Sequence, residues 1–213
     1  MTKKKNNYGK VTYEDKFNGK TILTDKEKGY GCREDILEAI DQRIEHATGK
    51  RSRTLCTRMD FRFARNSHPP KDNSRMTKFL STYNKDLKRS GDDPEYVCVR
   101  EQSREKHQHY HLILLTNQRN HQFPHKFIEK AEKHWAAANG LDNAKGLVDH
   151  CTKDRDGKKQ TNNYRLNRSD EDFEGVKNEC FKRCSYLAKI NTKGNQPKHK
   201  REVLCSRLPK SPK

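Results

Sequence analysis

Apolar residues in this chain are gathered into short segments between residues 53 and 152, and their spacing alternates between two periods. In the first segment, residues 53–63, Met59 and Phe61 fall on one face while the charged residues beside them fall on the other. The next segment has apolar residues three or four apart, which is typical of a helix that buries one side. Over residues 53–152 the order reads β-α-β-β-α-β. This order predicts an α+β fold of the ferredoxin-like type, an antiparallel sheet with its crossover helices on one face.

The same spacing predicts further elements on both sides of this region. The expected elements, in chain order, are a helix over Asp35–His46, a strand over 53–63, a helix over Ser74–Lys88, strands over Tyr96–Glu101 and Gln108–Thr116, a helix after Pro124, a strand over Gly146–Thr152 and a helix over Phe173–Lys189. The two middle strands are expected to form a hairpin through residues 102–107, and residues 162–166 to extend the last strand or pair with it.

Three regions follow from this organisation. We expect a basic N-terminal arm and helix over residues 1–50, a folded domain over 51–190 and a basic flexible tail over 191–213. Only 30% of the residues are hydrophobic and 36% are charged, so the chain can build one modest core at most. Its apolar runs are too short to cross a membrane. Seven cysteines without paired spacing, in a chain with no export signal, indicate reduced thiols in a cytosolic protein.

The charge balance predicts a polyanionic partner. The chain has 47 Lys and Arg against 29 Asp and Glu, a net charge of +18. Nucleic acid is the leading candidate, because each basic side chain on a phosphate releases condensed counterions. An anionic membrane fits less well, since no basic helix has a large apolar face. Arg53, Arg58 and Arg62 lie about the first strand and could contact a DNA backbone, or they could form an ordinary solvated face.

Histidines at alternating positions indicate a metal site. His109 and His111 are two apart on an expected strand, so both imidazoles point the same way. Glu101, near the end of the preceding strand, can lie opposite them in a hairpin. This set suits Mg²⁺ or Mn²⁺ on a phosphate oxygen, and zinc is chemically possible. His107 is in phase as well, so the pair could be His107 and His109, and the alternation could also be only a solvated strand face.

Two further groups of residues bear on chemistry. Tyr186 and Lys189 are three apart on the last expected helix and project from the same side. Tyr164, in a polar segment, is the rival nucleophile. Cys180 and Cys184 resemble half of a zinc site, but no second pair follows at finger spacing, so we expect them in the core.

Asp60 shares the face of Arg58 on the first strand. It could hydrogen-bond a ligand histidine from behind, or form a surface ion pair with Arg58, and the sequence favours the surface pair slightly.

Together these residues resemble a known family. The run His109-Tyr110-His111, the upstream Glu101 and the late Tyr186-Leu187-Ala188-Lys189 are similar to the single-tyrosine replication initiators of the HUH endonuclease superfamily. More narrowly, with Arg58-x-Asp60 on the first strand, the order resembles the inovirus-type replication initiators.

The resemblance implies a specific chemistry. The metal would be held by His109, His111 and Glu101, and Tyr186 would attack the phosphorus to leave a 5′-phosphotyrosyl enzyme and a free 3′-hydroxyl. Lys189 would stabilise the negative charge. The expected function is therefore initiation of rolling-circle replication by nicking and rejoining single-stranded origin DNA.

The same resemblance implies a context. The protein would be encoded by a phage or mobile element and work in the bacterial cytoplasm with a host polymerase. It would also need a host helicase, because the chain has no Gly-rich phosphate loop of its own. The alternatives are a non-catalytic basic nucleic-acid-binding module and a zinc hydrolase that leaves no protein on the DNA.

Overall fold

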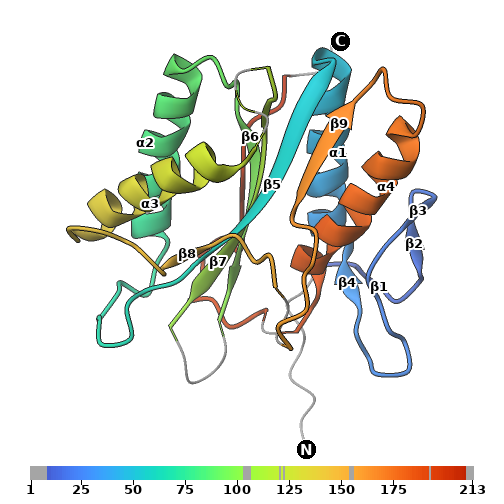
Figure 1. Ribbon diagram of the computed structural model, residues 1–213. Helices are drawn as coiled ribbons and strands as arrows, with labels where there is room; N and C mark the ends of the chain where they lie inside the picture. The colour runs from blue at the N-terminus through green and yellow to red at the C-terminus, as the bar shows by residue number, and fades with distance from the viewer. Residues whose placement is uncertain are drawn as a thin grey trace, which may run out of the picture.

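A six-stranded antiparallel sheet lies between two pairs of helices in the computed structural model, which gives three layers (Figure 1). Helices α2 (Ser74–Arg89) and α3 (His125–Asn139) cover one face of the sheet. Helices α1 (Glu34–Lys50) and α4 (Phe173–Cys184) cover the other. The structure describes residues 9–102, 107–119, 121, 123–153, 156–191 and 193–209.

The sheet is built around one long central strand. Its strands are, in chain order, β5 (Arg53–Phe61), β6 (Glu95–Glu101), β7 (His109–Asn117), β8 (Val148–Asp149), β9 (Asn163–Asn167) and β10 (Val203–Cys205). The order across the sheet is β10-β6-β7-β5-β8, and β9 pairs with β5 as well. β7 runs along one side of β5, while β9 and β8 pair with the first and last parts of β5 respectively.

Shorter elements complete the described chain. Two small ladders are formed by β1 (Val11–Thr12) with β4 (Cys32–Arg33) and by β2 (Lys16–Phe17) with β3 (Lys20–Thr21). A single 3₁₀ turn, η1 (Ser185–Ala188), follows α4 directly. None of the helices in the described part of the chain combines the length and apolar character needed to cross a membrane.

The face under α2 and α3 is an aromatic core. Met59 and Phe61 of β5 and Tyr110 of β7 point to this side, as their alternation with charged residues predicts. Trp135 of α3 is fully buried at its centre, and its ring lies 5.4 Å from that of Phe61. Its indole N–H donates to the carbonyl of Arg62, which satisfies the one polar atom of the side chain.

The opposite face is more mixed. Ile36 and Ile40 of α1 pack here against Val97 and Ile113 of the sheet and Phe181 of α4. Toward one end of the sheet this apolar packing gives way to charged side chains, among them Asp60 and His111, both nearly fully buried. This end of the sheet holds the candidate site residues that the sequence predicts.

The structure confirms the strand, helix, strand, strand, helix, strand order over residues 53–149 and the antiparallel pairing of β6 with β7. Residues 103–106 of the expected hairpin connection lie outside the described residues. The strand expected over Gly146–Thr152 is shorter and covers only Val148–Asp149. The next segment, β9, pairs with β5 rather than with β8.

The last helix does not run to Lys189 as its spacing predicted. It ends at Cys184 and continues as the 3₁₀ turn η1. The hydroxyl of Ser185 accepts a hydrogen bond from the N–H of Leu23 and donates one to the carbonyl of Lys182. A contact with a segment 162 residues away in sequence therefore sets the geometry of the turn, and local spacing cannot reveal it.

Part of the segment expected as a flexible tail is packed. Lys193 is buried, and Val203–Cys205 forms the edge strand β10 on β6. Glu202 beside it pairs with the buried guanidinium of Arg33. Strands pair through backbone N–H and C=O groups, so the basic side chains of this segment do not prevent it from joining the sheet edge. Residues 1–8 of the expected arm and 210–213 of the expected tail lie outside the described residues.

The aromatic core should depend on Trp135. Replacing Trp135 by Ala is expected to lower the free energy of unfolding by about 3–5 kcal/mol, because it removes a fully buried aromatic side chain and leaves a cavity. Urea unfolding followed by circular dichroism measures this. The matched control is Leu141→Ala, at a large apolar side chain that is exposed, with an expected change below about 1 kcal/mol. Equal losses in the two variants would contradict the central place of Trp135.

Candidate active site

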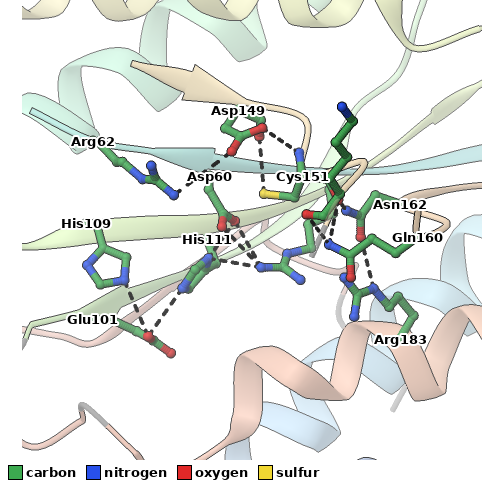
Figure 2. Close-up of polar contacts among 12 residues, drawn as sticks. Asp60, Arg62, Glu101, His109, His111, Asp149, Cys151, Gln160, Asn162 and Arg183 are labelled. Atoms are coloured by element: carbon green, nitrogen blue, oxygen red, sulfur yellow. Dashed lines mark hydrogen bonds and ion pairs between the residues drawn. The ribbon is translucent and has the colours of Figure 1, made fainter. Parts of the chain in front are cut away.

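Glu101, His109 and His111 converge at the shared end of β6 and β7. The antiparallel register places Glu101 directly opposite His109 and Val99 opposite His111. Nε2 of His109 lies 3.4 Å from Oε2 of Glu101, and Nε2 of His111 lies 3.3 Å from the same oxygen. Figure 2 shows both imidazoles turned toward this carboxylate. One carboxylate oxygen and two ring nitrogens therefore face a common point.

His111 is held from behind by Asp60. The β5–β7 register places these two residues opposite each other, and Nδ1 of His111 lies 2.5 Å from Oδ1 of Asp60. Burial alone would lower the pKa of His111, but the carboxylates of Asp60 and Glu101 outweigh it and raise that pKa. Burial likewise opposes ionisation of Asp60, yet the positive charges of His111 and Arg58 hold the pKa of Asp60 well below its usual range. The contact fixes the ring so that Nε2 points toward Glu101.

Glu101 is shared between the histidines and a buried lysine. Lys193 donates to Oε1 of Glu101 at 2.6 Å, which leaves Oε2 toward the imidazoles. Burial would raise the pKa of Glu101, but hydrogen bonds with His109 and His111 and the charge of Lys193 lower it strongly. The lowered pKa favours the ionised carboxylate. Burial lowers the pKa of Lys193 itself, although Glu101 opposes this.

These three side chains fit a divalent cation. Their ligand atoms all lie within 4.8 Å of one another. Adjacent ligands of an ion bound at about 2.1 Å lie about 3.0–3.4 Å apart, so the two histidine–glutamate separations of 3.4 and 3.3 Å need little adjustment. Nε2 of His111 is buried and faces the Glu101 carboxylate at 3.3 Å without the geometry of a well-directed hydrogen bond, so a metal ion between the two would satisfy it. A histidine ligand whose other ring nitrogen contacts a carboxylate is the usual arrangement in metal sites.

Tyr186 lies beside this cluster. Its ring, on η1, meets that of His111 edge to face, with 6.0 Å between the ring centroids. The guanidinium carbon of Arg58 and the Nζ of Lys189 each lie 4.6 Å from the Tyr186 centroid. Arg183 follows at 5.9 Å. Three cationic side chains therefore lie close to the Tyr186 ring.

Comparison with known proteins identifies a family. The model of the YagK/YfjJ C-terminal domain matches residues 12–201. The chain belongs to the YagK/YfjJ C-terminal domain family. The match is to this family rather than to the inovirus-type replication initiators, so the narrower resemblance is not supported.

The other comparisons add little. No curated protein matches the chain significantly. Among solved structures, the catalytic domain of the Adeno Associated Virus type 5 Rep protein is similar at 11% sequence identity and a TM-score of 0.25, over 60% of this chain and 94% of that one.

In this YagK/YfjJ-family chain, the arginines expected to contact DNA lie in different settings. Arg58 is buried and donates to both carboxylate oxygens of Asp60, so the expected surface pair is in fact a buried one. Asp60 contacts His111 as well as Arg58. Arg53 and Arg62 are exposed, but they lie at the first residue of β5 and just beyond its last, so they form no common patch.

The rival candidates are placed away from the cluster. His107 is exposed and, among the described residues, is not one of the ligand atoms that gather around Glu101. Tyr164 pairs with Cys56 in the β9–β5 ladder and packs against the α4 side of the core. Burial raises the pKa of Tyr164, which disfavours the phenolate.

Sequence reasoning missed two contributors. Lys193 looked like one more basic residue of a solvated segment, and no local signal marks it as the partner of Glu101. Arg183 faces outward on a helix by its spacing, yet its Nε donates to Oδ1 of Asn162 at 3.0 Å (Figure 2). Its guanidinium carbon lies 5.9 Å from the centroid of the Tyr186 ring.

The Asp60–His111 contact predicts a pH dependence in the metal-free protein. A histidine whose folded-state pKa is raised adds stability below its unfolded pKa of about 6.5, and this is lost as pH rises through the folded pKa. In Asp60→Asn, the His111 titration followed by NMR in chelator should move to lower pH. The stability difference between wild type and variant should be largest at about pH 4.5–6.5 and shrink above it.

The control for this prediction is Asp86→Asn, on α2 at the other side of the sheet, where the carboxylate pairs with His134. It should leave the His111 titration unchanged. A His111 titration that is the same in wild type and Asp60→Asn would show that Asp60 does not hold this imidazole.

Proposed function

We propose that this protein is a metal-dependent single-strand DNA endonuclease and strand transferase of the HUH type, with Tyr186 as the nucleophile. One observation carries the proposal. The rings of Tyr186 and His111, a member of the Glu101–His109–His111 donor set, meet edge to face, although the two residues lie on different elements, η1 and β7. A ferredoxin-like sheet with flanking helices would be the scaffold for this arrangement.

The chemistry assigned to Tyr186 is an in-line displacement at a phosphodiester. The phenol loses its proton and its oxygen forms a bond to phosphorus, while the bond from phosphorus to the 3′-oxygen breaks. The leaving 3′-oxygen takes up a proton and becomes a free hydroxyl. The 5′-phosphate stays on Tyr186, so a later attack by a 3′-hydroxyl reverses the step and joins the strand without a nucleotide cofactor.

The donor set would hold Mg²⁺ or Mn²⁺, which supplies charge stabilisation at the phosphate oxygen when bound. The protein prepares this position. Asp60 fixes the tautomer and direction of His111, while Lys193 orients Glu101 through its other oxygen.

The cations around Tyr186 stabilise the charge that develops on its oxygen. Nζ of Lys189, which directly follows the 3₁₀ turn, lies 4.6 Å from the centroid of the Tyr186 ring. The guanidinium carbon of Arg58, on β5, lies 4.6 Å from the same centroid. The net charge of +18 favours a polyanionic substrate. Arg53 and Arg62, both exposed, are proposed to contact the DNA backbone beyond the reacting phosphate.

The wider role follows from this reaction. We infer that the substrate is single-stranded origin DNA and that the nick starts rolling-circle replication of a phage or mobile element in the bacterial cytoplasm. The free 3′-hydroxyl would be extended by a host polymerase, and a host helicase would separate the strands.

Tyr186→Phe should abolish the covalent protein–DNA adduct. A pool of random-sequence single-stranded oligonucleotides labelled at the 3′ end is incubated with the protein and Mn²⁺, then run on a denaturing gel. The label should move with wild-type protein, because a 5′-phosphotyrosyl bond keeps the fragment downstream of the nick. With a 5′ label, wild type should release a free fragment ending in a hydroxyl.

Tyr164→Phe is the matched control, since it removes the rival phenol from a residue of the same type. It should form the adduct at the wild-type level. If Tyr186→Phe forms the adduct at undiminished yield, Tyr186 is not the nucleophile. DNA binding with no adduct and no metal dependence would favour the non-catalytic module, and cleavage without an adduct would favour a zinc hydrolase.

Glu101→Gln should weaken Mn²⁺ binding by at least about 10-fold, because it removes the charged member of the donor set. Calorimetric titration of the metal measures this, and nicking should fall in parallel and stop in excess chelator. Affinity in wild type should also fall as pH drops through the pKa of His111, because only the neutral ring binds metal.

The control is Glu95→Gln, at the other end of β6, where a buried carboxylate pairs with His46 and Lys50 away from the site. Metal affinity there should match wild type. If both variants bind Mn²⁺ as wild type does, the ion binds elsewhere.

A further inference from the structure

Three cysteines far apart in sequence meet inside the core on the α4 side of the sheet. Cys56 lies on β5, and Cys180 and Cys184 lie one turn apart on α4. All three are almost fully buried. Their sulfur atoms lie within 4.8 Å of one another, and the Sγ atoms of Cys56 and Cys184 are 3.9 Å apart. The Cys180–Cys184 pair predicted on the helix is therefore joined by a third thiol, Cys56, from the strand.

The spacing suits a metal bound by thiolates. For a sulfur–metal distance of about 2.3 Å, neighbouring sulfurs lie about 3.8–4.0 Å apart in a tetrahedral or trigonal site. The separation of Cys56 and Cys184 is within this range, so an ion would require little movement of the backbone there.

The surroundings favour a soft cation. Among the described residues the group contains three sulfurs and no oxygen or nitrogen ligand, and thiolates select copper(I) or zinc over magnesium and manganese. Hydrogen bonds with Cys180 and Cys56, and the positive charges of Arg58 and Arg183, hold the pKa of the Cys184 thiol well below its usual range. The pKa values of the Cys56 and Cys180 thiols are raised well above their usual range, so a bound cation would have to displace the protons of these two thiols.

We propose that Cys56, Cys180 and Cys184 form a second metal site, specific for a thiophilic cation, copper(I) or zinc, and separate from the Glu101–His109–His111 set. A bound ion would tie α4 to β5. Cys184 immediately precedes the turn that carries Tyr186, and Cys56 is two residues from Arg58. The ion would therefore fix the helix and strand that bring Tyr186 and Arg58 together.

The test uses the full chain carrying His109→Ala and His111→Ala, so that zinc cannot bind at the first donor set. Reduced protein is titrated anaerobically with Zn²⁺ or copper(I) against a chromogenic chelator. One equivalent of one of these ions should bind. Adding Cys180→Ala should weaken the affinity by at least about 100-fold, because one of three ligands is lost.

Cys98→Ala is the matched control, since Cys98 is a buried free thiol on β6 that faces the other core. It should bind the ion as the parent does. Uptake of neither ion by the folded parent, or uptake unchanged when all three cysteines are alanine, would overturn the proposal and leave the thiols as core packing.

A second measurement does not depend on the folding of any cysteine variant. Thiol alkylation in mild urea, read by mass spectrometry of the peptides, should be slowed by the ion at Cys56, Cys180 and Cys184 and not at Cys98. Equal alkylation with and without ion would also overturn the proposal. Because the histidines are absent throughout, the result is independent of whether the protein nicks DNA.

Discussion

The register between β5 and β7 is the constraint on which the rest of the structure depends. It places Asp60 opposite His111 and lets the carboxylate contact the ring nitrogen across the two strands. Side chains alternate along a strand, so a slip of one residue would turn both site histidines into the aromatic core around Trp135. The same slip would bring Tyr110 to the charged face. Apolar residues on one side and ionisable residues on the other therefore specify a single register.

Charge is tolerated inside this small core because it is paired. Arg58 bonds Asp60, and Lys193 bonds Glu101, so these two buried cations each have a buried anion beside them. Such pairs contribute little net stability, since removing both charges from water is costly. These pairs instead fix the orientation of the side chains around the site. Arg58 is held under the Tyr186 ring, and Glu101 keeps one oxygen for the histidines.

The sequence predicted the parts of the fold that are encoded locally. The apolar stripe of α2, the start of α3 after Pro124 and the His109–His111 alternation each concern residues within or directly beside one element. In a hairpin the neighbouring strand is also close in sequence, which is why the position of Glu101 beside the histidines could be predicted. The end of α4 at Cys184, the buried Lys193 and the third thiol at Cys56 depend on contacts across more than 90 residues, and no local spacing encodes them.

The two proposed metal sites do not compete, and the reason lies in β5. At successive positions on one face this strand carries Cys56, Arg58 and Asp60, so a sulfur ligand, a cation and the carboxylate behind His111 follow each other at the spacing of two residues. Imidazole and carboxylate suit harder ions, and a group of thiols suits softer ones. The guanidinium of Arg58 stands between them and repels a cation from the space beneath Tyr186. Each ion would thereby be confined to its own donors.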